Sequence, residues 1–453
     1  MARGQPVYLE KVVYNLRGGF LVRPLIIAVI LGCTGAVLSS LEESFPVLGN
    51  LVPKVLFPTN VDHQVAQTIL STIAESVMTV VSIVFAILLM TLTLASMQFS
   101  PRILVSFTKD RVTQWTLGVF LGTFSFCLSA MPAARSAPAP FSPILTVTCA
   151  MLLALVCVAW LLFFIHHISQ SISVNYIVDR IANETEAVIN EMMPQPRKGK
   201  LADLADRTPP PTDGASVLSH SSGYIRYIDI EKLMRAALEH KVTIVVTRRV
   251  GHFVPEGVRL VSVSNGEKLN EDLVEAIRDS FDIGPTRTLQ QDIEFGILQI
   301  VDIALRAISP AVNDPSTAIC CIDHLSRILI KVGSREPADS RFYSPPGKLR
   351  IFMPVLGLDR MVHSAFDQIR SYSKVDAAVS LRMLRALTDV SITVDEPEAR
   401  KMLALMGRRI LAGAESCLNE DELVEMRQRM IGLNKLALGP VAESGGGKLW
   451  RPE

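Results

Sequence analysis

Long uncharged runs of apolar residues occupy the first third of the chain. A bilayer core about 30 Å thick needs ~20 helical residues to cross it, and four runs reach that length, the first with help from its flanks. They cover residues 24–41, 76–101, 112–134 and 136–165. The first run ends in small residues, as a signal peptide does, but three further spans follow it and favour a retained helix. The pattern predicts a short N-terminal segment, residues 1–23, and a four-helix transmembrane domain over residues 24–168.

The basic residues of the short connections predict the direction of these spans. Lys and Arg concentrate in the loops that stay in the cytoplasm. The N-terminal segment and the connection between the second and third spans carry seven basic residues, whereas the other two connections carry two. The N-terminus is therefore expected in the cytoplasm, and an even number of spans puts the C-terminal part there too. Trp115 and Trp160 then fall near the cytoplasmic interface, where indole rings are favoured.

Beyond residue 168 the pattern becomes that of a charged, soluble domain. Residues 169–193 place apolar side chains at helical spacing, which predicts an amphipathic helix that continues out of the fourth span. Pro194 and Pro196 end it, and a stretch rich in Pro, Ser, Asp and Gly extends to Gly223. We interpret residues 169–223 as this helix followed by an exposed linker.

A β-rich subdomain is predicted over residues 224–264. Two short strands, 224–228 and 242–246, flank a helix over 230–240. Gly251 and Gly257 bracket a turn that resembles the turn of lipoyl- and biotinyl-type barrel-sandwich domains, which indicates a small β-sandwich-like piece. The carrier lysine of those domains sits in a tight hairpin, whereas Lys232 lies in the predicted helix. No carrier role is expected.

Residues 265–440 are predicted to form a helical bundle, and residues 441–453, which contain three consecutive glycines, a disordered tail. Asn419 and Glu422 form a capping-box pattern before the last helix. The fold class is therefore an α-helical transmembrane bundle of four spans followed by a cytoplasmic α+β domain. The expected helices of the bundle cover residues 269–281, 289–308, 315–332, 361–391, 396–415 and 420–438.

Composition excludes several classes of protein. Hydrophobic residues make up 49% and charged residues 20% of the 453 residues, which is too apolar for an ordinary soluble protein. The 45 Lys and Arg residues balance 44 Asp and Glu residues, so nucleic acid is not an expected partner. Seven cysteines, an odd number with no Cys-x-x-Cys pair, count against a disulfide framework and a thiolate zinc site.

The helix over 289–308 carries the most ordered polar pattern of the C-terminal part. Thr288 and Gln291 have the spacing of a capping box. A narrow polar stripe on a mostly apolar helix indicates either polar groups facing a buried partner, or a half-buried helix with a solvated edge and one weak ion pair. The second interpretation is preferred, because a structural ion pair has the same spacing. At about 100° per residue the stripe consists of Asp292, Gln299, Asp302 and Arg306.

Other polar motifs have structural explanations. Asp314 followed by Pro315 is a helix N-cap with proline at the first helical position, and an N-cap carboxylate opposes phosphate binding. No Walker-type or dinucleotide-type glycine pattern occurs. His166 and His167 point about 100° apart on a helix, so they do not chelate one metal easily. We expect no cofactor, no metal site, no catalytic residue and no enzymatic activity.

The second span has one polar face. Its members repeat at intervals of three and four residues, so they share one side of a helix. Such a face lines a water path or bonds to a neighbouring helix. Glu75 is either a functional ionisable group or a carboxylate at the outer surface, and the structural interpretation is preferred. The face consists of Thr72, Glu75, Thr79 and Ser82.

Several short motifs together resemble the bacterial family of predicted membrane proteins known as domain of unknown function 2254. The likeness covers about residues 10–440. It implies a bacterial inner-membrane location and supplies no activity, substrate or catalytic residue. The motifs that carry it are Gln98-Phe99-Ser100-Pro101-Arg102, Asp110-Arg111-Val112-Thr113-Gln114, Asp292-Ile293-Glu294-Phe295-Gly296, residues 301–307 and the segment from Ser309-Pro310 to Asn313-Asp314-Pro315.

The predicted partner of this multi-pass protein is the lipid bilayer. Three functional hypotheses follow. The leading hypothesis is a self-associating, channel-like or transport-related assembly, with the second span at the shared axis and a regulatory cytoplasmic domain. The alternative is a non-transporting scaffold that binds a protein or a small ligand of unknown identity. The third is a membrane-anchored enzyme that uses Asp292, Asp302 and Arg306.

Overall fold

The computed structural model describes residues 22–45, 47, 62–98, 110–135, 141–171, 173–195, 214–264 and 269–438. The expected tail at 441–453, the N-terminal segment, the loop at Pro101 and most of the predicted linker lie outside these residues. The chain divides into two compact units, Met1–Ser173 and Val174–Glu453. Each unit is described by itself.

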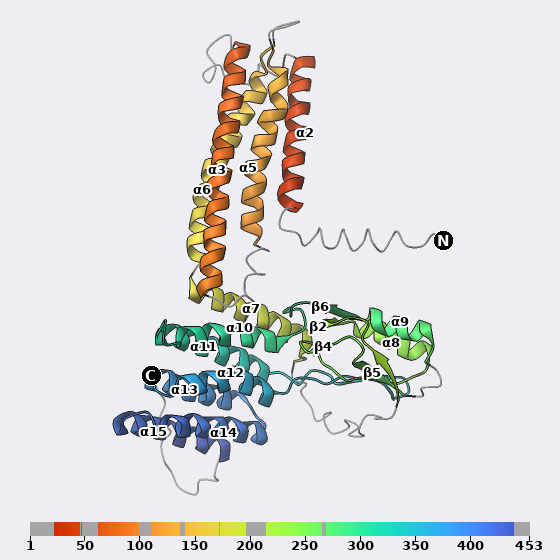
Figure 1. Cartoon of the computed structure of the whole chain (residues 1–453), viewed down its shortest axis with the longest axis vertical. Coiled ribbons are helices and arrows are strands. Elements are labelled where there is room, and N and C mark those ends of the chain that lie inside the picture. Colours follow the sequence, from red (N-terminus) through yellow and green to blue (C-terminus); the bar gives the residue numbers. More distant parts are fainter. Residues whose placement is uncertain are drawn as a thin grey trace. The chain divides into compact units, whose positions relative to one another are not determined.

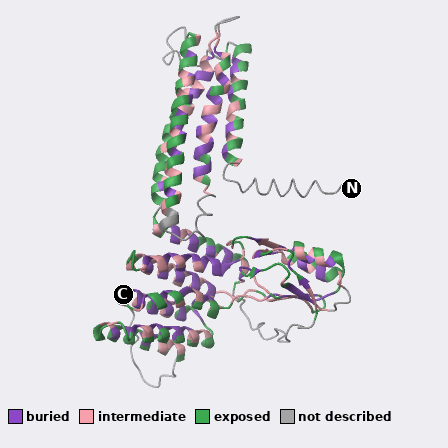
Figure 2. Ribbon diagram, in the orientation of Figure 1, coloured by how far each residue is buried: buried purple, intermediate pink, exposed green. Residues whose placement is uncertain are grey.

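The first unit contains the four apolar helices that the sequence predicts (Figure 1). Each has the length and composition to cross a bilayer. Half of the apolar window of α5 is buried, against 17–22% in the other three, so α5 is the central helix (Figure 2). The helices are α2 (Val22–Ser44), α3 (His63–Gln98), α5 (Arg111–Ala130) and α6 (Ile144–Ser171), with a 3₁₀ turn, η3 (Met131–Ala133), after α5.

Small residues bring α2 and α5 into close contact. A Cβ atom on Gly35 would lie 2.6 Å from the carbonyl oxygen of Phe126. On the facing helix, Gly122 packs against Leu31, whose Cδ1 would be 2.4 Å from an added Cβ. The hydroxyl of Ser129 donates to the carbonyl of Gly32 at 2.7 Å. This close approach, with a hydrogen bond across it, is typical of helix pairs in membranes.

A buried carboxylate joins the end of α2 to the start of α6. Glu42 is 2% exposed. It accepts hydrogen bonds from the Leu145 amide at 2.7 Å, and from the amide and hydroxyl of Thr146 at 3.0 and 2.9 Å. Glu42 therefore caps the first turn of α6, where free amides and the helix dipole stabilise a negative charge.

The amphipathic helix predicted to continue from the fourth span is a separate helix. α6 ends at Ser171, and α7 spans Val174–Met192 in the second unit. The apolar face of α7, including Ile177, Ile181 and Val188, is buried, and α7 packs against α10 and α11. The apolar face that the sequence predicts is confirmed, and it packs against the core of the second unit. The helix itself does not continue α6.

The β-rich part of the second unit is larger than the sequence predicts. Its two sheets have the strand orders β1-β5-β3-β8-β7 and β4-β2-β6, and they share one apolar core with α8 and α9. β1 lies in the predicted linker, whereas β6, β7 and β8 lie in the region predicted to be helical. The elements are β1 (Ala215–Leu218), β2 (Gly223–Ile228), α8 (Ile230–Glu239), β3 (Ile244–Val246), β4 (Phe253–Val254), β5 (Arg259–Val263), α9 (Glu271–Asp279), β6 (Phe281–Gly284), β7 (Arg341–Ser344) and β8 (Lys348–Phe352).

Six further helices belong to the described part of the second unit, and they stack with α7 in layers (Figure 1). The single helix predicted over 361–391 is two helices, because Asp376 accepts from the Val379 amide and starts a new one. The Asn419–Glu422 capping box is confirmed by reciprocal hydrogen bonds of 3.0 and 3.2 Å. The helices are α10 (Ile293–Ala307), α11 (Pro315–Gly333), α12 (Leu358–Tyr372), α13 (Ala377–Thr393), α14 (Pro397–Ala414) and α15 (Glu420–Leu438).

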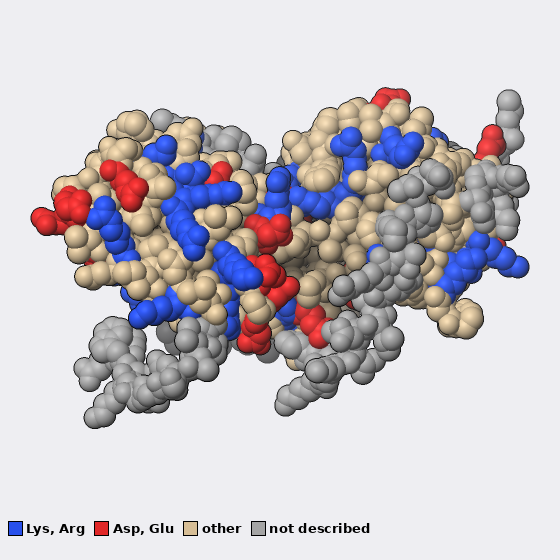
Figure 3. Space-filling model, turned by 90° about the horizontal axis from the view of Figure 1, so that it is seen from below, with Lys and Arg blue, Asp and Glu red and all other residues tan. Residues whose placement is uncertain are grey.

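The lower face of the molecule carries charges of both signs (Figure 3). Lys and Arg side chains are spread over the helical and the β-rich lobes, and Asp and Glu gather beside the hollow between them. On the last helix of the unit, Arg427 pairs with Glu420 and Arg429 with Glu425. Such a mixed surface is that of a solvated face.

Gly296 allows α10 to cross α7 closely, and we expect Gly296→Ala to destabilise the protein by about 1–3 kcal/mol through overpacking. An added Cβ would lie 2.0 Å from Oγ1 of Thr185, which is fully buried. Thr185→Ala in the same chain removes that atom and should restore part of the stability. Thermal unfolding of the full-length protein followed by circular dichroism measures both effects.

Gly432→Ala is the matched control, because Gly432 lies in α15 with nothing within 4 Å of an added Cβ. It should stabilise by about 0.5–1 kcal/mol, the usual gain for Gly to Ala in a helix. Equal effects of the two alanine substitutions, or no rescue by Thr185→Ala, would contradict the close crossing.

Candidate functional site

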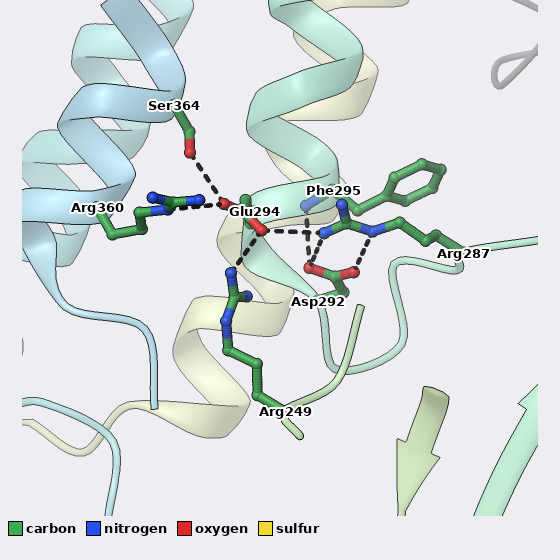
Figure 4. Close-up of polar contacts among 7 residues, drawn as sticks. All are labelled: Arg249, Arg287, Asp292, Glu294, Phe295, Arg360 and Ser364. Carbon is green, nitrogen blue, oxygen red and sulfur yellow. Dashed lines mark hydrogen bonds and ion pairs between the residues drawn. The ribbon is translucent and has the colours of Figure 1, made fainter. Parts of the chain in front are cut away.

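A polar cluster lies at the start of α10, where the helical and β-rich parts of the second unit meet (Figure 4). Asp292 is the N-cap of α10 and accepts from the Phe295 amide at 3.1 Å. Arg287 binds the same carboxylate in a bidentate manner, with Nε and Nη2 at 2.7 and 2.8 Å. The predicted capping box of Thr288 and Gln291 is therefore wrong. Gln291 instead bonds to the backbone of Ile228 in β2.

Glu294, in the first turn of α10, is the centre of the cluster. Its carboxylate accepts from Arg249 at 2.8 Å, from Arg287 at 3.3 Å and from the hydroxyl of Ser364 at 2.9 Å, and Arg360 lies 3.9 Å away. Burial opposes ionisation of Glu294, but these hydrogen bonds and charges outweigh it and hold its pKa below the usual value. Glu294 is therefore an anion that links α10, α12 and the loop after β3.

The loop between β3 and β4 fits closely over the cluster. Gly251 has φ +87°, and an added Cβ would lie 2.4 Å from Oδ2 of Asp292 and 2.7 Å from Nη2 of Arg287. Burial, together with the charge of Arg249, lowers the pKa of the neighbouring His252. The sequence predicts Gly251 in a turn, and in the folded protein this glycine lets the backbone touch the Arg287–Asp292 pair.

A small cavity of about 70 Å³ adjoins the cluster. That volume suits a few water molecules and not an organic ligand. Both carboxylates beside it are engaged by arginines, and the described residues contain no group of three His, Cys, Asp or Glu side chains able to hold a metal ion. The cluster is therefore an ion network that links α10, α12 and the loop after β3. The lining includes Met192, Met193, Arg249, Glu294, Met353 and Met361.

The four residues of the predicted polar stripe on α10 differ in burial. Asp292 and Gln299 are buried, whereas Asp302 and Arg306 are half-buried. Only Asp292 belongs to the cluster, since Arg306 lies 14 residues further along, roughly 21 Å at 1.5 Å per residue. A ligand role for the stripe stays a prediction. Sequence reasoning missed Arg249, Arg287 and Glu294, although the motif of residues 292–296 contains Glu294.

The polar face of α3 points away from the interior of the first unit. All four of its residues are exposed in the single chain. The hydroxyls of Thr79 and Ser82 bond to backbone carbonyls of their own helix at 2.9 and 3.1 Å. The described part of the chain supplies no hydrogen bond or ion pair to the Glu75 carboxylate. The apolar residues on the opposite side of α3 form the core. The face consists of Thr72, Glu75, Thr79 and Ser82, and the opposite side includes Ala74, Val77 and Val81.

The core contacts also fix the depth of Glu75. Ala74 packs in one apolar cluster and Val77 in the next, and Phe124 of α5 contacts both. Phe124 lies six residues before the end of α5 at Ala130, so Glu75 is roughly 9 Å inside that end at 1.5 Å per residue. The 20 residues of α5 have the length of a bilayer core of about 30 Å.

The adjacent histidines have separate partners within the first unit. His167 Nε2 lies 3.2 Å from Oδ2 of Asp110, the N-cap of α5. His166 Nε2 lies 3.2 Å from the side chain of Gln170. His167 therefore joins the end of α6 to the start of α5.

These features define a protein with four apolar helices and a separate α+β unit. The model of the family described as predicted membrane protein, domain of unknown function 2254, matches residues 17–389. An uncharacterized protein of Mycobacterium bovis, Mb1321c, is 32% identical over 399 residues, which cover 85% of this chain and 74% of that protein. The uncharacterized protein Rv1290c of Mycobacterium tuberculosis matches with the same identity and coverage. No solved structure matches the chain. The chain belongs to this family of predicted membrane proteins, as its motifs indicated.

We expect Gly251→Ala to destabilise the protein more than Gly257→Ala does. Both glycines have positive φ, +87° and +77°, so both substitutions carry a backbone cost of about 1–2 kcal/mol. Only at Gly251 does the new Cβ meet the Arg287–Asp292 pair, since nothing lies within 4 Å of Gly257. Urea unfolding of the two variants measures the difference, and identical midpoints would contradict the close fit of the loop.

We expect Glu294→Gln to destabilise the protein at neutral pH by about 3–5 kcal/mol, because it leaves the largely buried Arg249 without its anion. The folded-state pKa of Glu294 is lowered. Its ionised form therefore adds stability above its unfolded-state pKa, and this stability is lost as the pH falls through the folded-state pKa. The difference between wild type and variant should shrink on acidification from neutral pH to below that value.

Denaturant unfolding at several pH values measures this difference. Glu398→Gln is the control, because Glu398 is exposed and pairs only with exposed Lys401. A constant difference between wild type and Glu294→Gln at all pH values would contradict the ionised state of Glu294.

Proposed function

We propose that this protein is a subunit of an oligomeric, transport-related assembly of the bacterial inner membrane, in which the polar face of α3 lines a shared hydrated path. The observation that carries the proposal is Glu75, an exposed carboxylate on the outer face of an apolar helix bundle. It lies roughly 9 Å from the end of α5, and in a bilayer whose core matches the length of α5 this position lies below the headgroups.

The energetic argument concerns the surroundings of Glu75 in a bilayer. An ionised side chain facing the centre of the hydrocarbon costs about 2.5–3.5 kcal/mol even on permissive insertion scales. Thr72, Thr79 and Ser82 on the same face cannot neutralise that charge. Packing this face against equivalent faces around an axis removes Glu75 from lipid and gives it water. A ring of carboxylates favours cations over anions.

The proposed orientation places both termini in the cytoplasm. Its support is the excess of Lys and Arg in the N-terminal segment and in the connection between α3 and α5, residues 99–110. The α+β unit is then cytoplasmic and takes the regulatory part in the assembly. No catalytic activity is included, because Asp292 and Glu294, the buried carboxylates of its polar cluster, are both committed to arginines.

Cation flux tests the proposal directly. Purified full-length protein in lipid vesicles should conduct small cations, and Glu75→Gln should lower that flux by about tenfold, equivalent to ~1.4 kcal/mol on the barrier. Glu43→Gln is the control, because Glu43 pairs with Arg135 at the end of the bundle, outside the polar face of α3. Absence of flux from wild-type vesicles, or equal flux through Glu75→Gln, would rule out the path.

Disulfide cross-linking tests the arrangement of subunits. A cysteine at Thr79, in a chain whose native cysteines are replaced, should link two subunits in the membrane because α3 faces the axis. Leu155 of α6 is 66% exposed and supplies the comparison position. A cysteine there should stay monomeric. Efficient linking through Leu155 and none through Thr79 would place the subunit contact elsewhere.

A further inference from the structure

Four methionines line the small cavity beside the polar cluster of α10. They come from three separate segments, which are the end of α7, the loop after β8 and α12. They make up a quarter of the 16 methionines in the chain. Thioether side chains are therefore concentrated at the junction that Glu294 and its partners hold together (Figure 4). The four are Met192, Met193, Met353 and Met361.

The cavity gives small molecules a route to buried sulfur atoms. Met193, Met353 and Met361 are only 5%, 8% and 2% exposed. Met192 and Pro354 line the same space and are half-buried, so the cavity reaches the surface of the unit. Its volume of about 70 Å³ holds water-sized molecules, and hydrogen peroxide, with two oxygen atoms, is only slightly larger than water.

Methionines of the same burial elsewhere in the unit provide the comparison. A flexible methionine often fills a gap in an apolar core, and that role alone requires no open space beside the sulfur. Met383 of α13, Met406 of α14 and Met430 of α15 are 0%, 4% and 4% exposed and lie outside the cavity. Access through the cavity, and not exposure, therefore distinguishes the two groups.

We propose that this cavity is an oxidation site, where a small peroxide converts the lining methionines to sulfoxides. The sulfur lone pair forms a bond to one peroxide oxygen while the O–O bond breaks. The departing hydroxide takes the proton of the transferred oxygen and leaves as water. Sulfur loses two electrons and the peroxide gains them. The inference rests on the cavity and not on transport through the assembly.

A sulfoxide in this cavity changes the contacts of the polar cluster. Arg249 lines the same cavity and donates to Glu294 at 2.8 Å. The sulfoxide oxygen is polar, whereas a thioether is only a weak acceptor, so it competes with Glu294 for the Arg249 guanidinium. Oxidation therefore loosens the contact between the β-rich part and the helical stack, and methionine sulfoxide reductases reverse the change.

Peptide mass spectrometry of the full-length protein in lipid nanodiscs, treated with hydrogen peroxide, tests the site. Met361 should oxidise about tenfold faster than similarly buried Met430, a difference of ~1.4 kcal/mol on the barrier. Ala338→Leu fills part of the lining at a half-buried position, and it should remove most of this difference while the melting temperature stays near that of wild type. Equal rates for the two methionines in wild type, or unchanged rates in Ala338→Leu, would overturn the proposal.

The melting temperature tests the consequence for the fold. Peroxide treatment should lower it in the wild-type protein, and treatment with the methionine sulfoxide reductases should restore it. The control variant replaces the four cavity methionines by leucine, which conserves side-chain volume. It should show no such decrease, although its other methionines still oxidise. A decrease of the same size in this variant would overturn the assigned effect on the polar cluster.

Discussion

A hydrocarbon environment tolerates polar groups only where they satisfy one another, and this constraint shapes the four-helix unit. The hydroxyls of Thr68, Thr79 and Ser82 return to backbone carbonyls of their own helix. Glu42 is buried but receives three hydrogen bonds from the first turn of α6. Glu75 stands apart from these groups, because its carboxylate faces outward without a described partner. The proposed function therefore places other subunits beside it.

In the second unit, buried carboxylates pair with arginines. Asp292 and Glu294 lie at the start of α10, where the helix dipole already favours anions. Arg249 and Arg287 reach them from the β-rich side, and Ser364 reaches Glu294 from α12. The cluster therefore fixes the β-rich part to the helical stack. Because a buried ion pair of this kind is expensive to break, it specifies the arrangement of the unit more than it adds net stability.

The sequence predicts those features of the fold that depend on residues close together in the chain. The four apolar helices and the caps at Asp314 and Asn419 follow from residues near one another in the chain, and these predictions are confirmed. The division of residues 361–391 into α12 and α13 was missed, because Asp376 gives only a weak local signal inside an apolar pattern.

Long-range pairing explains the other misses. β8 joins the sheet beside β3, about a hundred residues earlier in the chain, so neither β7 nor β8 stood out within a region of helical pattern. The partnership of Arg249 with Glu294 likewise exists only after folding. The polar face of α3 was found because helical spacing reveals it, whereas its outward direction required the packing of Ala74 and Val77.

An electron cryomicroscopy structure of the full-length protein in lipid nanodiscs tests the central claim most directly. The account predicts a symmetric oligomer in which the α3 helices surround the axis, with the Glu75 carboxylates turned toward water inside the membrane. A monomer, or an oligomer whose Glu75 side chains point into lipid, would contradict it.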